Sequence, residues 1–223
     1  MKRITLTIAV ATLLLLACSN DKKADEAKTE TTTSTDTKMD ETTTDPKKDA
    51  MAMPDSATMA KNWQAYMTPG DVHKMMSKWN GNWNGELSMW MQPGAPEQKS
   101  TSTAVNKMVM NGLYQQSTHT GNMMGMPFNG VGTTAYDIHK KEFISTWIDN
   151  MGSGIMVLKG PWDEATKTIT LKGKMTDPGT TGDMDIKETF TIIDDNTQEM
   201  KMFMMMPDGK EFQTMNIKFT RKK

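Results

Sequence analysis

Cysteine is nearly absent from this chain of 223 residues. The single cysteine is Cys18, so the remainder of the sequence can form neither a disulfide nor a thiolate metal site, and it holds no cysteine nucleophile. Leucine is also scarce, because beyond the first eighteen residues only Leu87, Leu113, Leu158 and Leu171 occur. Other side chains must therefore fill the core of any folded domain.

The chain also lacks an excess of charge of either sign. It carries 26 Lys and Arg against 27 Asp and Glu, which gives a formal net charge of -1. A protein without clustered cations lacks the electrostatic footprint that a phosphate backbone requires, so we expect no nucleic-acid partner. The readable enzyme motifs are missing too: there is no His-Glu-x-x-His, no phosphate loop and no Gly-x-Ser-x-Gly. The sequence therefore predicts a non-enzymatic protein without a cofactor or a bound metal.

The first eighteen residues are typical of an export signal. Lys2 and Arg3 precede an apolar run over residues 4–17, which is too short to span a bilayer comfortably. The run ends in Leu15-Leu16-Ala17-Cys18, which resembles the lipobox of bacterial lipoproteins. That resemblance implies cleavage before Cys18, a thioether-linked diacylglycerol on its sulfur and an acylated new amino terminus. We therefore expect a signal peptide over residues 1–17 and a lipid-anchored protein of the bacterial cell envelope. The anchoring membrane would be the outer membrane, with the protein facing the periplasm or the cell surface.

The segment after Cys18 has a different composition. Residues 19–55 carry ten Asp or Glu and six Lys, together with many threonines. Such a segment cannot bury enough apolar surface to offset the entropy of ordering its backbone. We therefore predict a disordered tether over residues 18–60 and one folded domain over residues 61–223.

The folded region begins with a helix and continues as strands. Thr68-Pro69-Gly70-Asp71 predicts a helix start with Thr68 as N-cap, and the helix should reach about Lys78. Apolar and polar residues then alternate, as in half-buried strands, in runs separated by turns rich in Gly, Asn, Asp and Pro. These runs lie near residues 82–91, 100–110, 112–120, 127–138, 141–149, 154–162, 166–175, 184–193, 197–206 and 210–220. The pattern predicts an all-β fold: an antiparallel up-and-down β-barrel of about ten strands with one short N-terminal helix, and a sandwich is the alternative.

Several short stretches resemble one bacterial family. Gly81-Asn82-Trp83 is similar to the Gly-x-Trp signature of lipocalin-like barrels. Residues 125–130, Tyr136-Asp137 and residues 143–149 resemble the family catalogued as domain of unknown function 1579. The resemblance covers about residues 68–222, but Asn111-Gly112 stands where the family usually has a Gly-Gly pair. It implies the fold and its boundaries, and it implies no activity.

Glu188 is an unusual residue for its position. It shares a strand face with Met184, Ile186, Phe190 and Ile192, so it should point into the barrel among apolar side chains. An unpaired carboxylate is costly there, and either Lys107 or the Tyr136 hydroxyl could supply a partner. Glu188 could therefore close the barrel end through an ion pair, anchor a ligand in a cavity, or act with a histidine in a hydrolase or isomerase.

Methionine is abundant, with 25 residues in the chain. The simplest interpretation is that methionine fills core positions that leucine or isoleucine would otherwise occupy. The alternative is a Cu(I)-binding envelope protein, because Met200, Met202, Met204 and Met206 share one strand face and thioethers are soft ligands. That site would also require His119 or His139 nearby.

These observations favour a membrane-anchored lipoprotein that binds a small apolar ligand inside its barrel. The candidate ligand-binding residues are Trp83, Tyr136, Trp147, Glu188, Met202 and Met204. A structural or stress-related envelope module without any ligand is a further alternative, and it predicts a barrel packed solid with Met and Trp. The sequence does not set the oligomeric state.

The lipid anchor can be tested directly. Cys18→Ser removes the only thiol able to form the thioether, so the exported variant should be soluble rather than membrane-bound. Incorporation of radiolabelled palmitate measures the modification. Equal labelling of the variant and the wild type would contradict the prediction.

Overall fold

A computed structural model describes residues 53–223, so the predicted signal peptide, Cys18 and most of the predicted tether lie outside the described residues. Two helices begin the described part: α1 (Ser56–Tyr66) and α2 (Asp71–Ser77). The helix α1 was not expected, and it starts inside the range assigned to the tether. Asp55 caps it by accepting a hydrogen bond from the Thr58 amide at 2.9 Å. Neither helix in this part of the chain has the length and apolar character needed to cross a membrane.

The start of α2 differs in detail from the sequence prediction. Gly70, rather than Thr68, is the N-cap, and its amide donates to His73 Nδ1 at 3.0 Å. Thr68 belongs to the end of α1 instead, because its hydroxyl donates to the Gln64 carbonyl at 2.6 Å. A threonine can cap a following helix or hydrogen-bond back to a preceding turn, and the unexpected α1 supplies the second partner.

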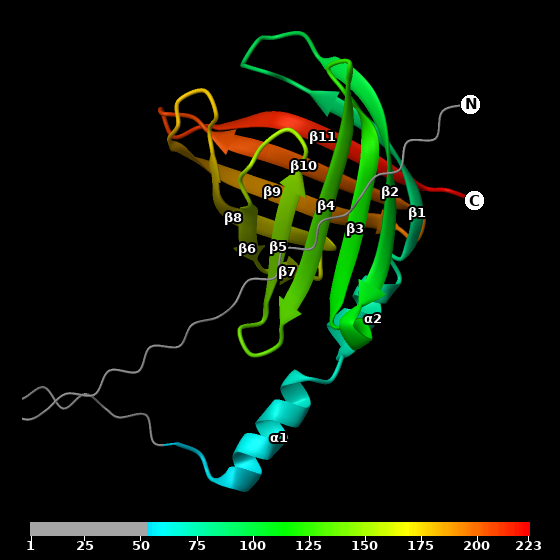
Figure 1. Ribbon diagram of the computed structural model, residues 1–223, viewed down its shortest axis with the longest axis vertical. Helices are drawn as coiled ribbons and strands as arrows, with labels where there is room; N and C mark the ends of the chain where they lie inside the picture. Colours follow the sequence, from blue (N-terminus) through cyan, green and yellow to red (C-terminus); the bar gives the residue numbers. More distant parts are fainter. Residues whose placement is uncertain (1–52) are drawn as a thin grey trace, which may run out of the picture. The chain divides into compact units, whose positions relative to one another are not determined.

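Eleven strands follow the helices, all joined in antiparallel pairs. They are β1 (Gly81–Met89), β2 (Gln98–Val109), β3 (Tyr114–Met123), β4 (Met126–Asp137), β5 (Glu142–Asp149), β6 (Met156–Gly160), β7 (Trp162–Asp163), β8 (Thr168–Thr176), β9 (Asp183–Asp194), β10 (Thr197–Met205) and β11 (Glu211–Arg221). A short 3₁₀ turn, η1 (Met110–Gly112), joins β2 to β3. Sequential neighbours pair except β6 and β7, β1 pairs with β11, and β6 pairs with β8. With β7 a two-residue side strand, the ten others form a closed barrel, which confirms the predicted fold (Figure 1).

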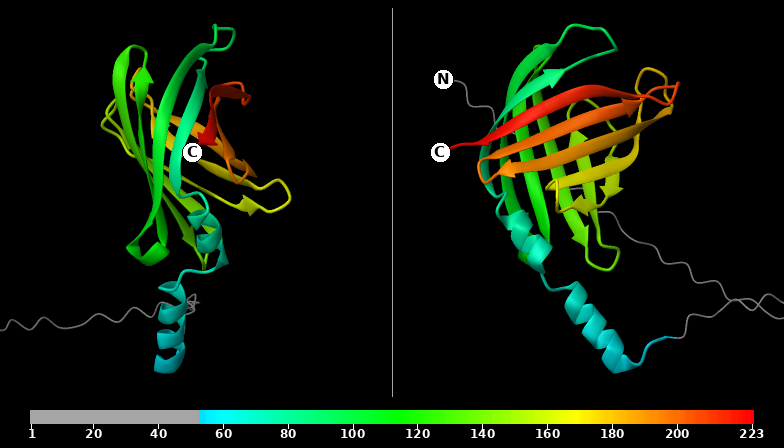
Figure 2. Two further views of the ribbon diagram at one scale, coloured as in Figure 1. Left: turned by 90° about the vertical axis from the view of Figure 1, so that its right-hand side faces the viewer. Right: turned by 180° about the vertical axis from the view of Figure 1, so that it is seen from behind.

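The two sides of the barrel cross each other. Figure 1 shows β2 to β5 running across the direction of β8 to β11, and the view from behind in Figure 2 shows β9, β10 and β11 in front of them. Twisted sheets that close on themselves adopt this arrangement, because the strand direction rotates steadily from one neighbour to the next. The interior of the barrel is therefore bounded on one side by β2 to β5 and on the other side by β8 to β11.

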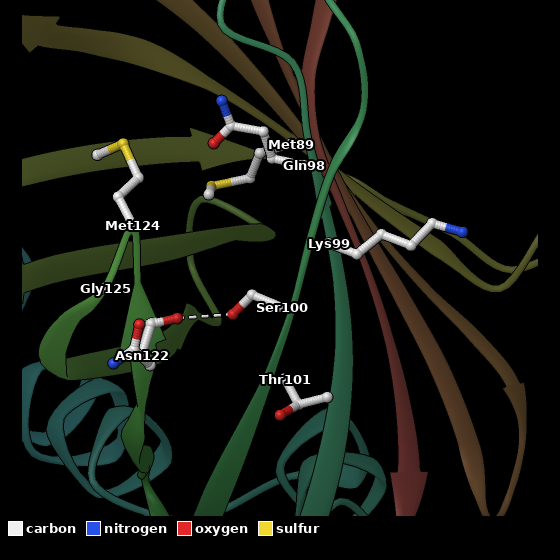
Figure 3. Close-up of a pocket in the computed structure, with 8 residues that line it drawn as sticks. All are labelled: Met89, Gln98, Lys99, Ser100, Thr101, Asn122, Met124 and Gly125. Carbon is white, nitrogen blue, oxygen red and sulfur yellow. Dashed lines mark hydrogen bonds between the residues drawn. The ribbon is translucent and has the colours of Figure 1, made fainter.

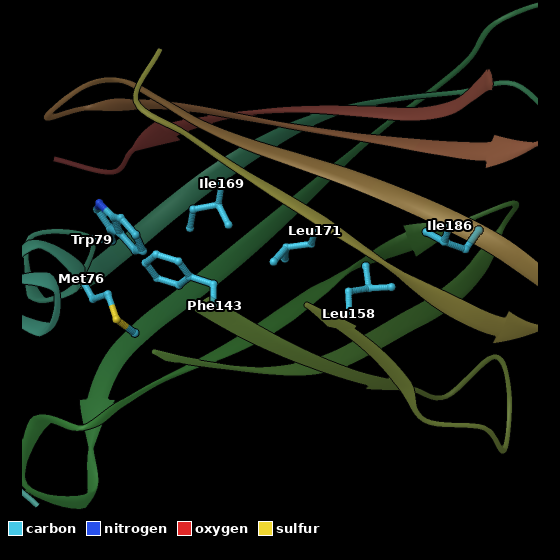
Figure 4. Close-up of a cluster of buried hydrophobic side chains, with 7 residues drawn as sticks. All are labelled: Met76, Trp79, Phe143, Leu158, Ile169, Leu171 and Ile186. Atoms are coloured by element: carbon cyan, nitrogen blue, oxygen red, sulfur yellow. The ribbon is translucent and has the colours of Figure 1, made fainter. Parts of the chain in front are cut away.

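One cluster of buried side chains runs from the end of the interior beside α2 along the inside of the barrel to Leu158 and Ile186 (Figure 4). Met76 of α2 and Trp79 just after it pack against Phe143 of β5, while Ile169 and Leu171 lie along the inside of β8 (Figure 4). Trp79 also meets Phe190 of β9 edge-on, with ring centroids 5.7 Å apart. The end of the barrel beside α2 is therefore filled with side chains.

Side chains from several strands hold α2 in this position by binding the carbonyl groups at its end. Gln115 Nε2 donates to the Met76 carbonyl at 2.8 Å, and Trp83 Nε1 donates to the Trp79 carbonyl at 3.0 Å. Arg221 donates to the carbonyls of Lys78 and Asn80, and its guanidinium lies 4.2 Å over the Trp83 ring. A cation at a helix C-terminus also interacts favourably with the helix dipole. These contacts hold α2 at one end of the barrel, which the helix closes as a plug.

Barrel closure depends on a short seam between β6 and β8. Only three residue pairs join the two strands: Val157 with Lys174, Leu158 with Gly173, and Lys159 with Lys172. A Cβ on Gly173 would overlap the Val157 carbonyl, and a Cβ on Gly160 would overlap the Thr170 carbonyl. Both glycines are therefore required for the close approach of the backbones, and neither needs a left-handed conformation.

We predict that Gly173→Ala destabilises the protein by about 1–3 kcal/mol, the usual cost of forcing extra atoms into a packed position. The added methyl group would push β6 from β8 and weaken the seam. Urea unfolding followed by tryptophan fluorescence measures the effect. Gly152→Ala is the control, because nothing lies within 4 Å of its Cβ position. Equal stability of the two variants would contradict the role of the seam.

Candidate ligand cavity

The barrel encloses a cavity of about 700 Å³. Trp79 forms part of its lining at the end that α2 plugs. The connection between β5 and β6, from Met151 to Ile155, lines the cavity together with Thr176 at the end of β8 and Pro178 after it. The packing of α2 therefore fills one end of the barrel. Away from that end, residues of the connections after β5 and β8 line the cavity.

One wall of the cavity is rich in polar side chains. Strands β2 to β5 supply hydroxyl, amide and imidazole groups: Ser100, Ser102, Asn106, Gln115, Ser117, His119, Thr134 and Ser145. Two of these residues hold buried oxygens, Ser102 Oγ and Asn106 Oδ1, that have no hydrogen-bond partner among residues 53–223. Buried polar atoms are nearly always paired, so this wall offers unused hydrogen-bonding capacity.

The facing wall is mostly apolar, with three polar residues. Strands β8 to β11 contribute Ile169, Leu171, Met175, Phe190, Met200, Met202, Met215, Ile217 and Phe219. The polar residues are Thr176, Glu188 and Gln198. Leu171 and Met202 lie directly beside Glu188 on the neighbouring strands, and Ile186 and Phe190 flank it on its own strand face. The carboxyl group therefore stands in an apolar surrounding.

No described residue donates a hydrogen bond to the Glu188 carboxylate or forms an ion pair with it. The other carboxylate of the lining, Asp149, has both oxygens occupied: it accepts from Trp147 Nε1 at 2.7 Å and from the Met151 amide at 2.8 Å. Burial raises the pKa of Glu188 from its ordinary value of 4.5 to about 7, because removal from water penalises the charged form. Glu188 is thus a carboxyl group that changes charge near neutral pH.

His119 is the only histidine of the lining and lies on the opposite wall from Glu188, on β3. It meets Trp147 edge-on at 5.0 Å and Phe219 at 5.8 Å, measured between ring centroids. Burial lowers its pKa from 6.5 to about 4, so the imidazole is neutral at physiological pH. A neutral imidazole can donate or accept a hydrogen bond in the cavity.

Trp147 owes its position to two glycines that the sequence analysis did not explain. Its indole lies against Gly130 and Gly132 of β4, where a Cβ on Gly130 would overlap the ring. Phe128 stacks beside the same indole with ring centroids 6.3 Å apart. The short Gly130-x-Gly132 pattern therefore provides space for an aromatic side chain that faces the cavity.

The structure separates the six candidate residues into two groups. Trp147, Glu188 and Met202 line the cavity. Trp83, Tyr136 and Met204 do not belong to the lining: Trp83 is buried beneath Arg221, Tyr136 packs against His73 and Phe143, and Met204 packs against the core cluster around Leu158 and Ile186. Strand alternation predicted correctly that these side chains point into the barrel. It could not predict their positions along the barrel axis.

The proposed partners of Glu188 are wrong. Lys107 is exposed and lies on the outer face of β2, because Ala104 and Asn106 point inward. Tyr136 points inward but belongs to the filled end of the barrel, where it meets Phe143 with ring centroids 5.0 Å apart. Val105 and Val109 share the outer face of β2 with Lys107, whereas its inward positions carry small and polar side chains around the cavity.

The methionines mostly pack in the interior. Met76 is fully buried, and eleven others pack partly buried against the two core clusters: Met75, Met89, Met108, Met123, Met156, Met175, Met184, Met200, Met202, Met204 and Met215. Met200 packs against the cluster around Trp83, whereas Met202 and Met204 pack against the cluster around Leu158. Within residues 53–223 no group of three or more His, Cys, Asp or Glu could hold a metal ion.

A smaller pocket of about 340 Å³ adjoins the cavity, and the two share Ser100, Thr101 and Asn122 (Figure 3). Ser100 Oγ donates to the Asn122 carbonyl at 2.6 Å across this pocket. Met89 and Met124 supply its apolar side, while Lys99 points away from Ser100 and Met124. The pocket therefore extends the main cavity between β2 and the β3–β4 turn.

Comparison with known proteins places the chain in a family. Residues 68–221 match the family described as "Protein of unknown function (DUF1579)". The chain belongs to this family. The expected family boundaries are therefore confirmed, and this DUF1579 domain coincides with α2 and the barrel.

Two solved structures share the fold of this DUF1579 protein. Rv2717c from M. tuberculosis is 12% identical, with a TM-score of 0.54 over 70% of this chain and 100% of that chain. The S-type phycobiliprotein lyase CPES from Guillardia theta is 11% identical, with a TM-score of 0.50 over 72% of this chain and 97% of that chain. At such identities the likeness shows the lipocalin-like barrel fold alone. No curated protein matches the sequence significantly.

The two shifted pKa values predict opposite effects of pH on stability. The folded-state pKa of Glu188 lies above its ordinary value, so its protonation favours the folded state, and this contribution is lost as pH rises from 4.5 through about 7. The folded-state pKa of His119 lies below its ordinary value, so its contribution is lost as pH falls from 6.5 through about 4. Between pH 4.5 and 6.5 both groups titrate, and a rise in pH removes the contribution of Glu188 while it restores that of His119.

We therefore predict that Glu188→Gln is more stable than the wild type at pH 8 by roughly 3 kcal/mol or less, the equivalent of the pKa shift. The advantage should shrink towards zero near pH 4, where Glu188 is protonated in both states. Urea unfolding of the two proteins from pH 4 to pH 8 measures the difference. A constant difference across this range would show that Glu188 has an ordinary pKa.

Proposed function

We propose that this protein binds a small, largely apolar molecule inside its barrel and carries it in the bacterial cell envelope on a lipid anchor at Cys18. The observation that carries this proposal is the cavity of about 700 Å³. Small-molecule sites in proteins have about 300–1,000 Å³, mostly apolar walls and a few polar groups that orient the ligand. The lining of this barrel fits that description.

The cavity favours binding over a purely structural role. A module without a ligand would gain stability from a solid interior, because each void forfeits packing contacts and apolar burial. Here glycine and serine stand at inward positions of β2 to β5, including Ser102, Ser117, Gly121 and Gly132. These small residues keep open a space that larger side chains would fill. One structural neighbour is a phycobiliprotein lyase, and its barrel offers a precedent for the fold but none for a particular ligand.

The enzyme alternative rests on Glu188 and His119, which line the same cavity. In a catalytic pair the two side chains lie within hydrogen-bond reach of each other. Glu188 and His119 stand on β9 and β3, in opposite walls, and no hydrogen bond joins them in the described part of the chain. This arrangement supports a role for Glu188 as a ligand anchor in preference to a Glu-His pair.

A fluorescent apolar probe tests the proposal. We expect the purified protein to bind N-phenyl-1-naphthylamine in a saturable one-to-one manner, with enhanced probe fluorescence. Ser145→Phe should weaken this binding about tenfold or more, because Ser145 lines the cavity and the larger ring occupies the ligand's space. Fluorescence titration measures both affinities.

The matched control is Thr146→Phe, which places the same ring on the outer face of the same strand. It should leave probe binding unchanged. Circular dichroism and urea unfolding confirm that both variants remain folded. Absence of saturable binding to the wild type, or equal binding by the two variants, would contradict a ligand cavity in the barrel.

A further inference from the structure

The charge of the cavity lining narrows the chemistry of the ligand. In the described part of the chain, the residues that line the cavity include no lysine or arginine, but they include two carboxylates, Asp149 and Glu188. A buried anion needs a cation or several hydrogen-bond donors. An acidic ligand, such as a fatty acid, would find no cation here and would meet a carboxyl group on the apolar wall.

Among residues 53–223, Glu188 is the carboxyl group of the lining that has neither a hydrogen-bond donor nor an ion-pair partner. The charged residues on the neighbouring strands face outward: Lys187 pairs with Glu211, Lys174 pairs with Asp185, Lys201 pairs with Glu199, and Lys172 of β8 is exposed. Lys159 of β6 is exposed as well. Inside, the only other titratable groups of the lining are His119, which is neutral, and Asp149, whose oxygens are already occupied. No described residue serves as a partner for Glu188, so a ligand can supply one.

Aromatic rings in the lining also favour a cationic ligand. Trp79, Phe128, Trp147, Phe190 and Phe219 all line the cavity. Phe190 follows Glu188 on the same strand face, and Trp79 packs edge-on against Phe190. The faces of aromatic rings attract cations, and the attraction is stronger in a site that excludes water. A carboxylate beside aromatic rings in an apolar cavity is a combination suited to a cation with an apolar body.

We propose that the ligand is a lipophilic amine, whose apolar body fills the barrel and whose protonated nitrogen donates hydrogen bonds to the Glu188 carboxylate. This inference rests on the proposed function and deepens it by assigning the chemical class of the ligand. The hydroxyl and amide groups of β2 to β5 bind further polar groups along one side of the molecule. Asp149 does not bind the amine directly, because both of its carboxylate oxygens already accept hydrogen bonds from Trp147 and Met151.

Three molecules with the same chain and different head groups test the inference: dodecylamine, dodecanol and dodecanoate, each below its critical micelle concentration. At pH 7.5 dodecylamine should displace N-phenyl-1-naphthylamine at about tenfold lower concentration than dodecanol, and dodecanoate should be the weakest competitor. Glu188→Gln should lose the preference for the amine, when each displacement is corrected for the variant's own affinity for the probe. Asp185→Asn, which removes an exposed carboxylate from the same strand, should keep that preference.

The pH dependence provides a second readout. Burial sets the pKa of Glu188 at about 7, so the affinity for dodecylamine should fall up to tenfold per pH unit as pH drops below 7. The affinity of Glu188→Gln should not change over this range. Probe binding with equal displacement by all three molecules, or strongest displacement by dodecanoate, would overturn the amine assignment and leave the proposed function standing. Failure of the probe and of all three molecules to bind would overturn both.

Discussion

The three residue pairs between β6 and β8 are the contact on which the rest of the structure depends. Without them the ten strands would form an open sheet with two exposed edges, and the inward side chains would face water. Gly160 and Gly173 allow the backbones at this seam to approach closely. Closure converts the alternation of side chains along each strand into an inside and an outside, and so creates the enclosed space in which Glu188 has no partner.

The plug formed by α2 sets the second boundary of that space. Carbonyl groups at its C-terminal end accept hydrogen bonds from Gln115, Trp83 and Arg221, which come from three different strands. Met76 and Trp79 consequently fill one end of the interior. The space that remains has a polar wall from β2 to β5 and an apolar wall from β8 to β11. The binding proposal and the amine proposal both follow from this division.

Much of the fold could be predicted from the sequence, because strand alternation and turn residues are local signals. The ten expected runs correspond to the ten barrel strands, and Glu188 was expected on an inward face. The inward face of β2 was harder to assign, since Val105 points outward while Asn106 points inward. A cavity with a polar wall reverses the usual rule that apolar residues face inside, so alternation alone misplaces residues such as Lys107.

The positions of residues along the barrel could not be predicted either. Tyr136 and Trp147 both point inward, but only long-range packing decides that Tyr136 meets His73 beside α2 while Trp147 lines the cavity. The role of Gly130 and Gly132 likewise depends on the indole of the neighbouring strand. Helix α1 was missed because it buries no residue, so its sequence carries no apolar stripe at helical spacing.

The central claim is that Glu188 lies on the apolar wall of the cavity without a partner among residues 53–223. The most direct measurement is a ¹³C NMR titration of the glutamate side-chain carboxyl resonances in the wild type, with the Glu188 signal assigned by its loss in Glu188→Gln. The account predicts a carboxyl group that titrates at a pKa of about 7. A Glu188 resonance that titrates at the ordinary value of 4.5 would place the group in water or beside a cation and would contradict the account.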